Sequence, residues 1–406
     1  MIRPDAPRTP WNGDTNTSMG QLPPEMLLRD VCMPGTHDSA SLLGYCHAMS
    51  TTQYARIEQQ LDAGIRFLDL RVKTDGEREL KMVHGSEDIG GYYDDSGRLS
   101  FRVVLEKILD WMDAHPDETV IMKVVDCDHE FGTEPDDYDT DRRINRIWRE
   151  LEHKKAPERM RRSFNRLRAH DARFHLGCTL GQVRGQLLLW RVFKDLRASA
   201  PPPGKTTGVF GLDLYDLRRY DDQARIVVTA PAASDPAHAS DRIDVLRCQS
   251  RYEGATDGVG KFITYAQKMT LIANMLQEAW GGDDVFTLNE LNIGTSAGQS
   301  KGSFASYQPV TNATYINPLV EALLDEMLAG PKLSAGVPEF APHSGVGVLL
   351  FDWADPDAAR DHDMTVQHNH PIYGKVIRLN FERPWMWHTS EFQPHDDPPY
   401  VEWRVL

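Results

Sequence analysis

Three short segments in the first part of the chain each end an apolar run in ionisable side chains. The first carries His37 and Asp38, the second carries Asp69 and Arg71, and the third carries His84. Active sites have this pattern where successive strands of a parallel barrel deliver side chains to one rim. Two imidazoles, two carboxylates and a guanidinium gathered there could move protons around a phosphate group.

Displacement at a phosphodiester requires a base for the attacking hydroxyl, an acid for the departing oxygen and a positive group for the non-bridging oxygens. Two histidines meet the first two needs, because an imidazole can accept or give a proton near neutral pH. Arg71 meets the third through a forked, permanently charged contact. Asp352 ends the last predicted strand, which adjoins the first strand if the barrel closes, so it could orient the base.

Each of these residues also has a structural interpretation. Either histidine taken alone could be a structural or surface residue, and Asp69 with Arg71 could form an ordinary salt bridge. Asp352 could be a turn residue. Three strand ends in order, all carrying such side chains, favour the catalytic interpretation.

The elements that would position these side chains alternate between strands and helices. Apolar spacing predicts helices over 53–63 and 101–114, the second capped by Ser100 and ended by His115-Pro116. Apolar runs predict strands at 26–33, 65–72, 80–83, 119–125, 187–193, 209–214, 243–248, 285–291 and 346–351. This order favours an α/β barrel with a parallel sheet inside and helices outside. Nine strands are one more than a closed barrel of eight needs, so we expect one of them to be wrong.

The same reading divides the chain of 406 residues into one large domain and two tails. Residues 1–24 are a polar N-terminal tail, 25–385 the barrel and 386–406 a C-terminal tail. An acidic and then basic insertion, at about 128–172, contains an amphipathic helix with Trp148 on its apolar stripe. That helix could pack on the domain or lie on anionic lipid, and the glycine-rich stretch 294–306 could be a lid or an ordinary loop.

Composition excludes several classes of protein. The formal charge of −15 argues against nucleic-acid binding, and no apolar run of about 18 residues could span a membrane. Five scattered cysteines without paired spacing argue against a disulfide framework or structural zinc. The N-terminus lacks a secretory signal, so we expect a cytoplasmic protein, with peripheral membrane attachment or export by another route as alternatives. The oligomeric state is not predicted.

Several motifs resemble the X-type catalytic region of the phosphatidylinositol-specific phospholipase C family, particularly its bacterial and fungal branch. They are PGTHDS at 34–39, AGIRFLDLR at 63–71, HG at 84–85, PDETVI at 116–121 and TLGQVRG at 179–185. The resemblance is strong from about residue 28 to 193 and thinner from there to about 380. It implies a distorted TIM-type (β/α)8 barrel, and cleavage by the substrate's own inositol 2-hydroxyl to give a cyclic inositol phosphate and diacylglycerol.

The resemblance also implies roles for six residues. His37 would be the general base and Asp352 the carboxylate that orients it. His84 would be the general acid, assisted by Asp38, and Asp69 would support that pair. Arg71 would bind the phosphate. Eukaryotic members hold calcium through acidic residues, and one of these falls where this chain has Arg71. Because a guanidinium can replace the charge of a cation but cannot ligate it, we expect a metal-independent enzyme with no cofactor.

The headgroup region departs from the family pattern at two positions. Lys123, Arg191 and Tyr252 are candidates for substrate binding, because Lys123 interrupts a buried strand and the other two match the family's headgroup region. Bacterial relatives often carry aspartate at the position of Ser250, and an adjacent basic pair is reduced here to Arg191. The substrate is therefore expected to be phosphatidylinositol or a related phospholipid at a membrane surface. A soluble or non-inositol phosphodiester, or headgroup binding without catalysis, is the alternative.

Overall fold

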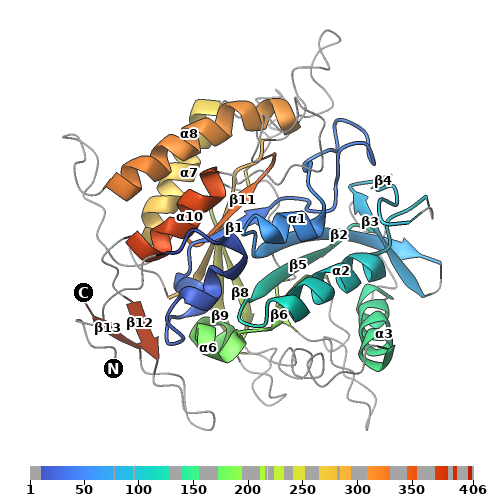
Figure 1. Cartoon of the computed structure of the whole chain (residues 1–406), viewed down its shortest axis with the longest axis horizontal. Helices are drawn as coiled ribbons and strands as arrows, with labels where there is room; N and C mark the ends of the chain where they lie inside the picture. Colours follow the sequence, from blue (N-terminus) through green and yellow to red (C-terminus); the bar gives the residue numbers. More distant parts are fainter. Residues whose placement is uncertain are drawn as a thin grey trace.

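The computed structural model confirms an α/β barrel, with a nearly closed sheet surrounded by helices (Figure 1). It describes residues 11–76, 78–94, 97–128, 139–154, 172–193, 211–214, 217, 224–232, 241–251, 265–280, 284–293, 309–329, 345–353, 371–382, 387–390 and 401–404.

The barrel strands follow one another around the sheet in the order β7-β6-β5-β2-β1-β11-β10-β9-β8. Their bounds are β1 Met33–Thr36, β2 Phe67–Asp75, β5 Val120–Asp126, β6 Leu187–Val192, β7 Leu212–Asp213, β8 Ile226–Pro231, β9 Arg242–Gln249, β10 Phe286–Glu290 and β11 Val348–Phe351. Neighbours are parallel from β7 to β9, and β8 alone is antiparallel. Within the described ranges no backbone pairing joins β7 to β8, so the distortion of the barrel lies there.

One predicted barrel strand is wrong in direction. Residues 80–83 belong to β3 (Glu79–His84), which returns antiparallel along β2 and then pairs with β4 (Glu87–Asp88), outside the circuit of the barrel. This is the surplus strand of the nine. A parallel connection needs a crossover of a dozen or more residues, and the few residues between 72 and 80 allow only a hairpin.

One barrel strand was missed. No strand was predicted in the segment 223–241, which includes a stretch rich in Pro, Ala and Ser, yet Ile226–Pro231 forms β8 beside β9. Pro231 ends this strand at the open edge of the sheet, where a residue without an N–H donor is tolerated.

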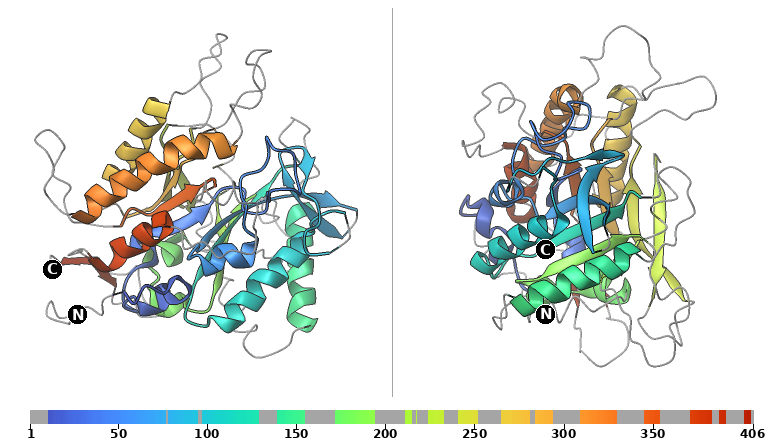
Figure 2. Two further views of the ribbon diagram at one scale, coloured as in Figure 1. Left: turned by 45° about the horizontal axis from the view of Figure 1, so that its top comes forward. Right: turned by 90° about the vertical axis from the view of Figure 1, so that its right-hand side faces the viewer.

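The helices lie outside the sheet in two groups (Figures 1 and 2). The first group contains α1 (Ile57–Asp62), α2 (Phe101–Ala114) and α3 (Asp139–Lys154), and the second contains α7 (Tyr265–Trp280), α8 (Pro309–Ala329) and α10 (Pro371–Glu382). Two short helices, α5 (Ala172–Gly177) and α6 (Leu180–Val183), precede β6. As predicted, Ser100 caps α2 by accepting from the Arg102 N–H.

Aromatic rings from three different strands meet inside the barrel. Trp190 of β6 contacts the rings of Phe67 on β2 and Phe286 on β10, at centroid distances of 5.3 and 5.0 Å. Alternate residues of a strand share a face, so the residues at 69 and 71 of β2 also point inward, as predicted. At Gly35 on β1 an added Cβ would lie 2.9 Å from the Phe67 Cβ, so only glycine fits there. These three rings, the aromatic layer, thus close the barrel interior beneath its polar end.

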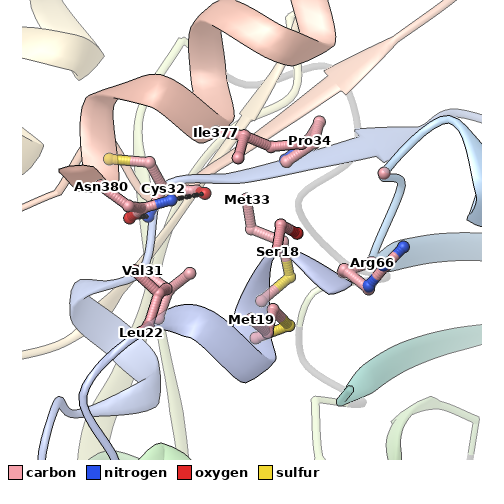
Figure 3. Close-up of a pocket in the computed structure, with 11 residues that line it drawn as sticks. Ser18, Met19, Leu22, Val31, Cys32, Met33, Pro34, Arg66, Ile377 and Asn380 are labelled. Atoms are coloured by element: carbon pink, nitrogen blue, oxygen red, sulfur yellow. Dashed lines mark hydrogen bonds between the residues drawn. The ribbon is translucent and has the colours of Figure 1, made fainter. Parts of the chain in front are cut away.

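Residues 11–24, the described part of the predicted N-terminal tail, pack on the other end of the barrel. Three short 3-10 helices, η1 (Thr15–Thr17), η2 (Met19–Gln21) and η3 (Leu28–Asp30), lead into β1. Met19 and Leu22 are buried there beside a cavity of about 10 Å³, which also touches Cys32 and Ile377 (Figure 3). A cavity of this size holds at most about one water molecule, so it is no substrate site.

The outer parts of the chain settle one alternative. On α3 the apolar stripe, Trp148 included, is buried against the domain, so Trp148 does not lie at a lipid surface.

In the predicted C-terminal tail, β12 (Trp387–Ser390) pairs antiparallel with β13 (Val401–Arg404). None of the five cysteines forms a disulfide. The rest of the insertion after Lys154 and the glycine-rich stretch 294–306 lie outside the described residues.

Candidate active site

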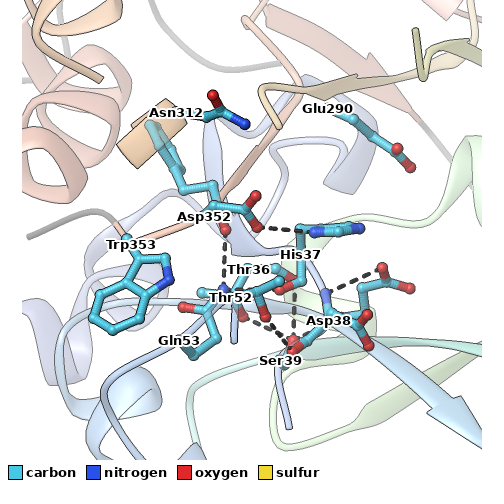
Figure 4. Close-up of polar contacts among 12 residues, drawn as sticks. Thr36, His37, Asp38, Ser39, Thr52, Gln53, Glu290, Asn312, Asp352 and Trp353 are labelled. Carbon is cyan, nitrogen blue, oxygen red and sulfur yellow. Dashed lines mark hydrogen bonds and ion pairs between the residues drawn. The ribbon is translucent and has the colours of Figure 1, made fainter. Parts of the chain in front are cut away.

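His37 lies just past the end of β1 and is joined to the end of β11. Its Nδ1 lies 2.8 Å from Oδ1 of Asp352, and both side chains are buried. The dashed line between these two side chains in Figure 4 marks this contact. Gln53 fixes the same junction, because its Nε2 donates to the carbonyl oxygens of His37 and Phe351. Barrel closure between β1 and β11 therefore brings together two residues 315 positions apart.

Arg71 contacts the other nitrogen of the His37 ring, with Nη2 2.7 Å from Nε2. A guanidinium can only donate, so Nε2 is the acceptor and Nδ1 carries the proton that Asp352 accepts. Burial alone would lower the pKa of His37, but the charge and hydrogen bond of Asp352 outweigh burial and Arg71, and the pKa is raised above its usual 6.5. The arrangement presents a base with a fixed tautomer.

Asp38 joins Arg71 to the second histidine. Its Oδ2 lies 3.4 Å from Arg71 Nε and 2.5 Å from His84 Nδ1. Burial would raise the pKa of Asp38, but Arg71 and His84 hold it well below its usual range, so the carboxylate stays ionised. His84 reaches the site from the antiparallel strand β3, with a quarter of its side chain exposed.

The backbone at Asp38 is held in a conformation that is rare for a residue other than glycine. Its φ is +45°, in the left-handed region, which aspartate tolerates better than most residues. Its carbonyl oxygen accepts from Thr52 Oγ1 at 2.9 Å and from the Ser41 N–H at 2.8 Å. Strained residues that their surroundings hold in place cluster at functional sites.

Three more charged groups lie deeper in the barrel. Lys123 Nζ is 3.2 Å from Asp69 Oδ1 and 3.2 Å from Glu290 Oε1, and Arg71 Nη2 is 3.6 Å from Asp69 Oδ2. Burial would raise the pKa of Asp69, but Lys123 and Arg71 lower it overall. Burial would lower the pKa of Lys123, but Asp69 and Glu290 raise it overall, so the lysine stays charged.

The structure brings together seven of the nine residues predicted for the site. Arg191 is not among them. It follows the inward-facing Trp190 on β6, so it points out of the barrel, where its Nε donates to the Gly211 carbonyl at 3.4 Å. The structure thus places Arg191 apart from this cluster, and its substrate-binding role stays a prediction, while Tyr252 lies outside the described residues.

Sequence reasoning missed Glu290 and Gln53. Glu290 is the penultimate residue of the predicted strand at 285–291, and a carboxylate at the end of an inward-facing series was the signal for it. Gln53 was assigned to a helix that in fact begins at Ile57. Nothing in its spacing indicated that its side chain would bridge two strand ends.

The comparison with family models decides what this region resembles. Residues 27–134 match the PI-PLC X 1 family model. The X region predicted from the sequence is thereby confirmed over that stretch. It contains His37, Asp38, Asp69, Arg71 and His84, while Asp352 comes from the far end of the chain.

Two kinds of similarity extend beyond the X region. The 1-phosphatidylinositol phosphodiesterase of Listeria monocytogenes is 32% identical over 127 residues, which are 29% of this chain and 36% of that protein. This match thus spans about a third of the length of the curated relative.

The fold as a whole is similar to solved structures. The phosphatidylinositol-specific phospholipase C of Staphylococcus aureus covers 90% of this chain and 98% of its own, at 18% identity and a TM-score of 0.57. The Listeria monocytogenes enzyme gives the same coverage, at 20% identity and a TM-score of 0.54. At such low identity the likeness establishes the barrel fold, which extends from the X region to the C-terminal half.

Within the described ranges no helix has the length and hydropathy needed to cross a bilayer. In the same part of the chain, no group of three His, Cys, Asp or Glu side chains is placed to hold a metal ion.

Proposed function

We propose that this protein cleaves the phosphodiester of phosphatidylinositol, or of a closely related phospholipid, by acid–base catalysis between His37 and His84. The observation that carries the proposal is the unbroken array of contacts from Asp352 through His37, Arg71 and Asp38 to His84. It supplies a base, a phosphate-binding cation and an acid in one place.

In the first step, Nε2 of His37 takes the proton of a hydroxyl adjacent to the phosphate on the headgroup ring. That oxygen bonds to phosphorus while the bond from phosphorus to the diacylglycerol oxygen breaks. His84 gives its proton to the departing oxygen, and the products are a cyclic phosphate and diacylglycerol. Slower hydrolysis of the cyclic phosphate would use the same two groups with their roles exchanged.

Arg71 has two tasks in this mechanism. In the free protein it donates to Nε2 of His37, so the base is engaged until a substrate arrives. Phosphate oxygens, being charged acceptors, would draw the guanidinium away and release Nε2 for the hydroxyl. Arg71 would then neutralise the charge that builds up on the non-bridging oxygens.

We also propose that the reaction needs no metal ion. Arg71 lies against both Asp38 and Asp69, and Lys123 lies against Asp69, so fixed cations already neutralise the carboxylates that could otherwise bind one. Cleavage should be unchanged by EGTA, and its abolition would contradict this part of the proposal.

One experiment separates the proposal from its rivals. Purified protein is assayed side by side on vesicles of phosphatidylinositol and sphingomyelin, and on soluble glycerophosphodiesters, with His37→Ala as the inactive control. We expect turnover of phosphatidylinositol that His37→Ala abolishes. Preference for a soluble diester would favour a different substrate on the same scaffold, and binding of lipid without turnover would favour a binding module.

The site of action follows from the substrate. A phospholipid is presented at a membrane surface, so we propose that the protein acts there as a peripheral enzyme. The cytoplasmic location expected from the sequence stays a prediction.

A further inference from the structure

Glu290 is a buried carboxylate at the site to which no role has been assigned. It ends β10 with 7% of its surface exposed, and it lies outside the stretch matched by the family model. Oε1 contacts Lys123, whereas Oε2 has no hydrogen bond or ion pair among the described residues. Oε2 is not among the fully buried polar atoms that lack a partner, so it is accessible to accept a hydrogen bond from a ligand.

The strand register directs this side chain into the barrel. Asn289 of β10 is paired with Gln249 of β9, and both side chains are engaged on the outer face. Gln249 Nε2 donates to Asn289 Oδ1, and Asn289 Nδ2 donates to the Ile272 carbonyl of α7. Glu290, one residue on, therefore faces the interior with the catalytic groups, and it is drawn with them in Figure 4.

The end of β10 is rigid. Gln249 Nε2 also donates to the main-chain oxygen of Glu290 at 2.8 Å, and its Oε1 accepts from Nζ of the fully buried Lys268 at 3.1 Å. A side chain supported in this way is positioned in advance for a ligand.

Glu290 is not needed to neutralise the cations of the site. Among the described residues, Asp38, Asp69 and Asp352 face two permanent cations, Arg71 and Lys123, and Glu290 adds a fourth carboxylate to this part of the site. Lys123 has Asp69 at 3.2 Å and does not require a second partner. A surplus acceptor paired with a permanent donor is suited to neighbouring hydroxyl groups, which both give and accept hydrogen bonds.

We propose that Glu290 and Lys123 form a hydroxyl-binding pair for an uncharged polyol headgroup, Glu290 accepting from one ring hydroxyl and Lys123 donating to the next. This inference rests on the proposed phospholipase function and names the part of the substrate that the deeper end of the site recognises. Lys123 can donate to a ring hydroxyl because its ammonium group has three N–H donors. Asp69 and Glu290 occupy two of them, which leaves the third for the ligand.

The test compares Glu290→Gln with the wild-type protein on phosphatidylinositol and on analogues that each lack one ring hydroxyl other than the attacking one. We expect kcat/KM for phosphatidylinositol to fall about 10- to 100-fold, mainly through KM, as for loss of a charged hydrogen bond. For one analogue the wild type should already be impaired and the substitution should cost little more. An equal loss on every analogue would overturn the proposal and make Glu290 a positioning residue for Lys123.

Two controls accompany this test. Glu321→Gln breaks another Lys–Glu pair, to Lys375 at 2.8 Å between α8 and α10, and should leave KM unchanged. Glu290→Asp retains the charge and the partner, and it serves if Glu290→Gln does not fold. Its shortened carboxylate should show the same dependence on one hydroxyl, and a uniform effect on all analogues would again contradict the proposal.

A binding measurement separates this inference from the proposed function. Titration with inositol alone, followed by NMR, should show binding to the wild-type protein that Glu290→Gln weakens by at least about 10-fold. Equal binding by both proteins would contradict the role of Glu290 even if phosphatidylinositol is cleaved. A wild-type protein that cleaves no phosphatidylinositol would instead contradict the proposed function.

Discussion

At the scale of single residues, the proton of His37 is controlled from both sides of the ring. Asp352 holds Nδ1 at 2.8 Å and raises the pKa of the ring, while Arg71 lies 2.7 Å from Nε2 and opposes protonation. A base must be neutral to act, so raising its pKa moves the loss of activity on acidification to a higher pH. The pH dependence of activity therefore reports on the contact between His37 and Asp352.

Replacing Asp352 by Asn should change both the rate and the pH profile. We expect kcat to fall by about 100- to 10,000-fold, the range of general-base catalysis, because the ring loses its oriented tautomer. In the wild type, the acidic limb of kcat/KM should have its midpoint above the ordinary histidine pKa of 6.5. In Asp352→Asn it should move to lower pH, and an unmoved limb would mean that Asp352 does not set the pKa of the base.

The general acid can be tested through the leaving group. His84→Ala should lower turnover of phosphatidylinositol by about 100-fold or more, because an alkoxide leaves poorly without a proton. On a substrate whose leaving group is a nitrophenolate, the same variant should lose little, since that group leaves unprotonated. A similar loss on both substrates would indicate that His84 binds or positions the substrate instead.

At the scale of elements, the site depends on how the ends of β1 and β11 are joined. After β11 the chain turns at Trp353, whose φ is +35°, and Asn317 of α8 donates to the carbonyl oxygens of Asp352 and Trp353, both at 2.9 Å. The helix thus fixes the direction in which Asp352 leaves its strand.

Asn317→Ala should therefore act on catalysis as well as on stability. Loss of two buried hydrogen bonds predicts destabilisation of about 2–4 kcal/mol, measured by denaturant unfolding. The acidic limb of the pH profile should shift in the same direction as in Asp352→Asn, by a smaller amount. Lower stability with an unchanged pH profile would show that Asn317 supports the fold without orienting the site.

The sequence predicted the strands better than it predicted their pairing. The period of two along β2 placed Phe67, Asp69 and Arg71 on one face. From 67 to 72 polar residues occur on that face only, so the two faces of the strand could be distinguished in the sequence. No such alternation exists in β6, which is buried on both faces, so Arg191 could not be separated from the inward-facing Trp190. The direction of β3 was readable only from the short connection before it.

At the scale of the whole molecule, chemistry and stability lie at opposite ends of the barrel. Below the aromatic layer, Arg66 Nε pairs with Glu118 Oε2 at 2.7 Å, with 1% of each side chain exposed. Glu118 also accepts from the Gly20 N–H, and Arg66 Nη2 donates to the Thr15 carbonyl. This buried pair attaches the N-terminal segment to the barrel.

Glu118→Gln should test that division of labour. Because the substitution leaves a buried guanidinium uncompensated, we expect unfolding to become easier by about 3–5 kcal/mol. As a matched control, Glu278→Gln breaks an exposed pair with Arg225 and should cost less than about 1 kcal/mol. Below its unfolding midpoint, Glu118→Gln should retain wild-type kcat, and a lower value would show coupling between the two ends.

The architecture of the molecule was largely predictable, whereas its closure was not. The order of strands and helices indicated a barrel, and the motif at 34–39 indicated the site. The meeting of His37 with Asp352, and of Lys123 with Glu290, depends on contacts across long stretches of chain that local patterns do not encode. The burial of Met19 and Leu22 within the predicted N-terminal tail was not indicated by the sequence, because these two residues are isolated among polar ones.

The central claim is that a hydroxyl of the substrate, activated by His37, attacks its own phosphorus. Phosphorus NMR of the wild-type reaction on phosphatidylinositol tests this most directly. A cyclic phosphodiester should appear first, and a phosphomonoester should follow from it more slowly. A phosphomonoester formed from the start, with no cyclic phosphate at any time, would contradict it.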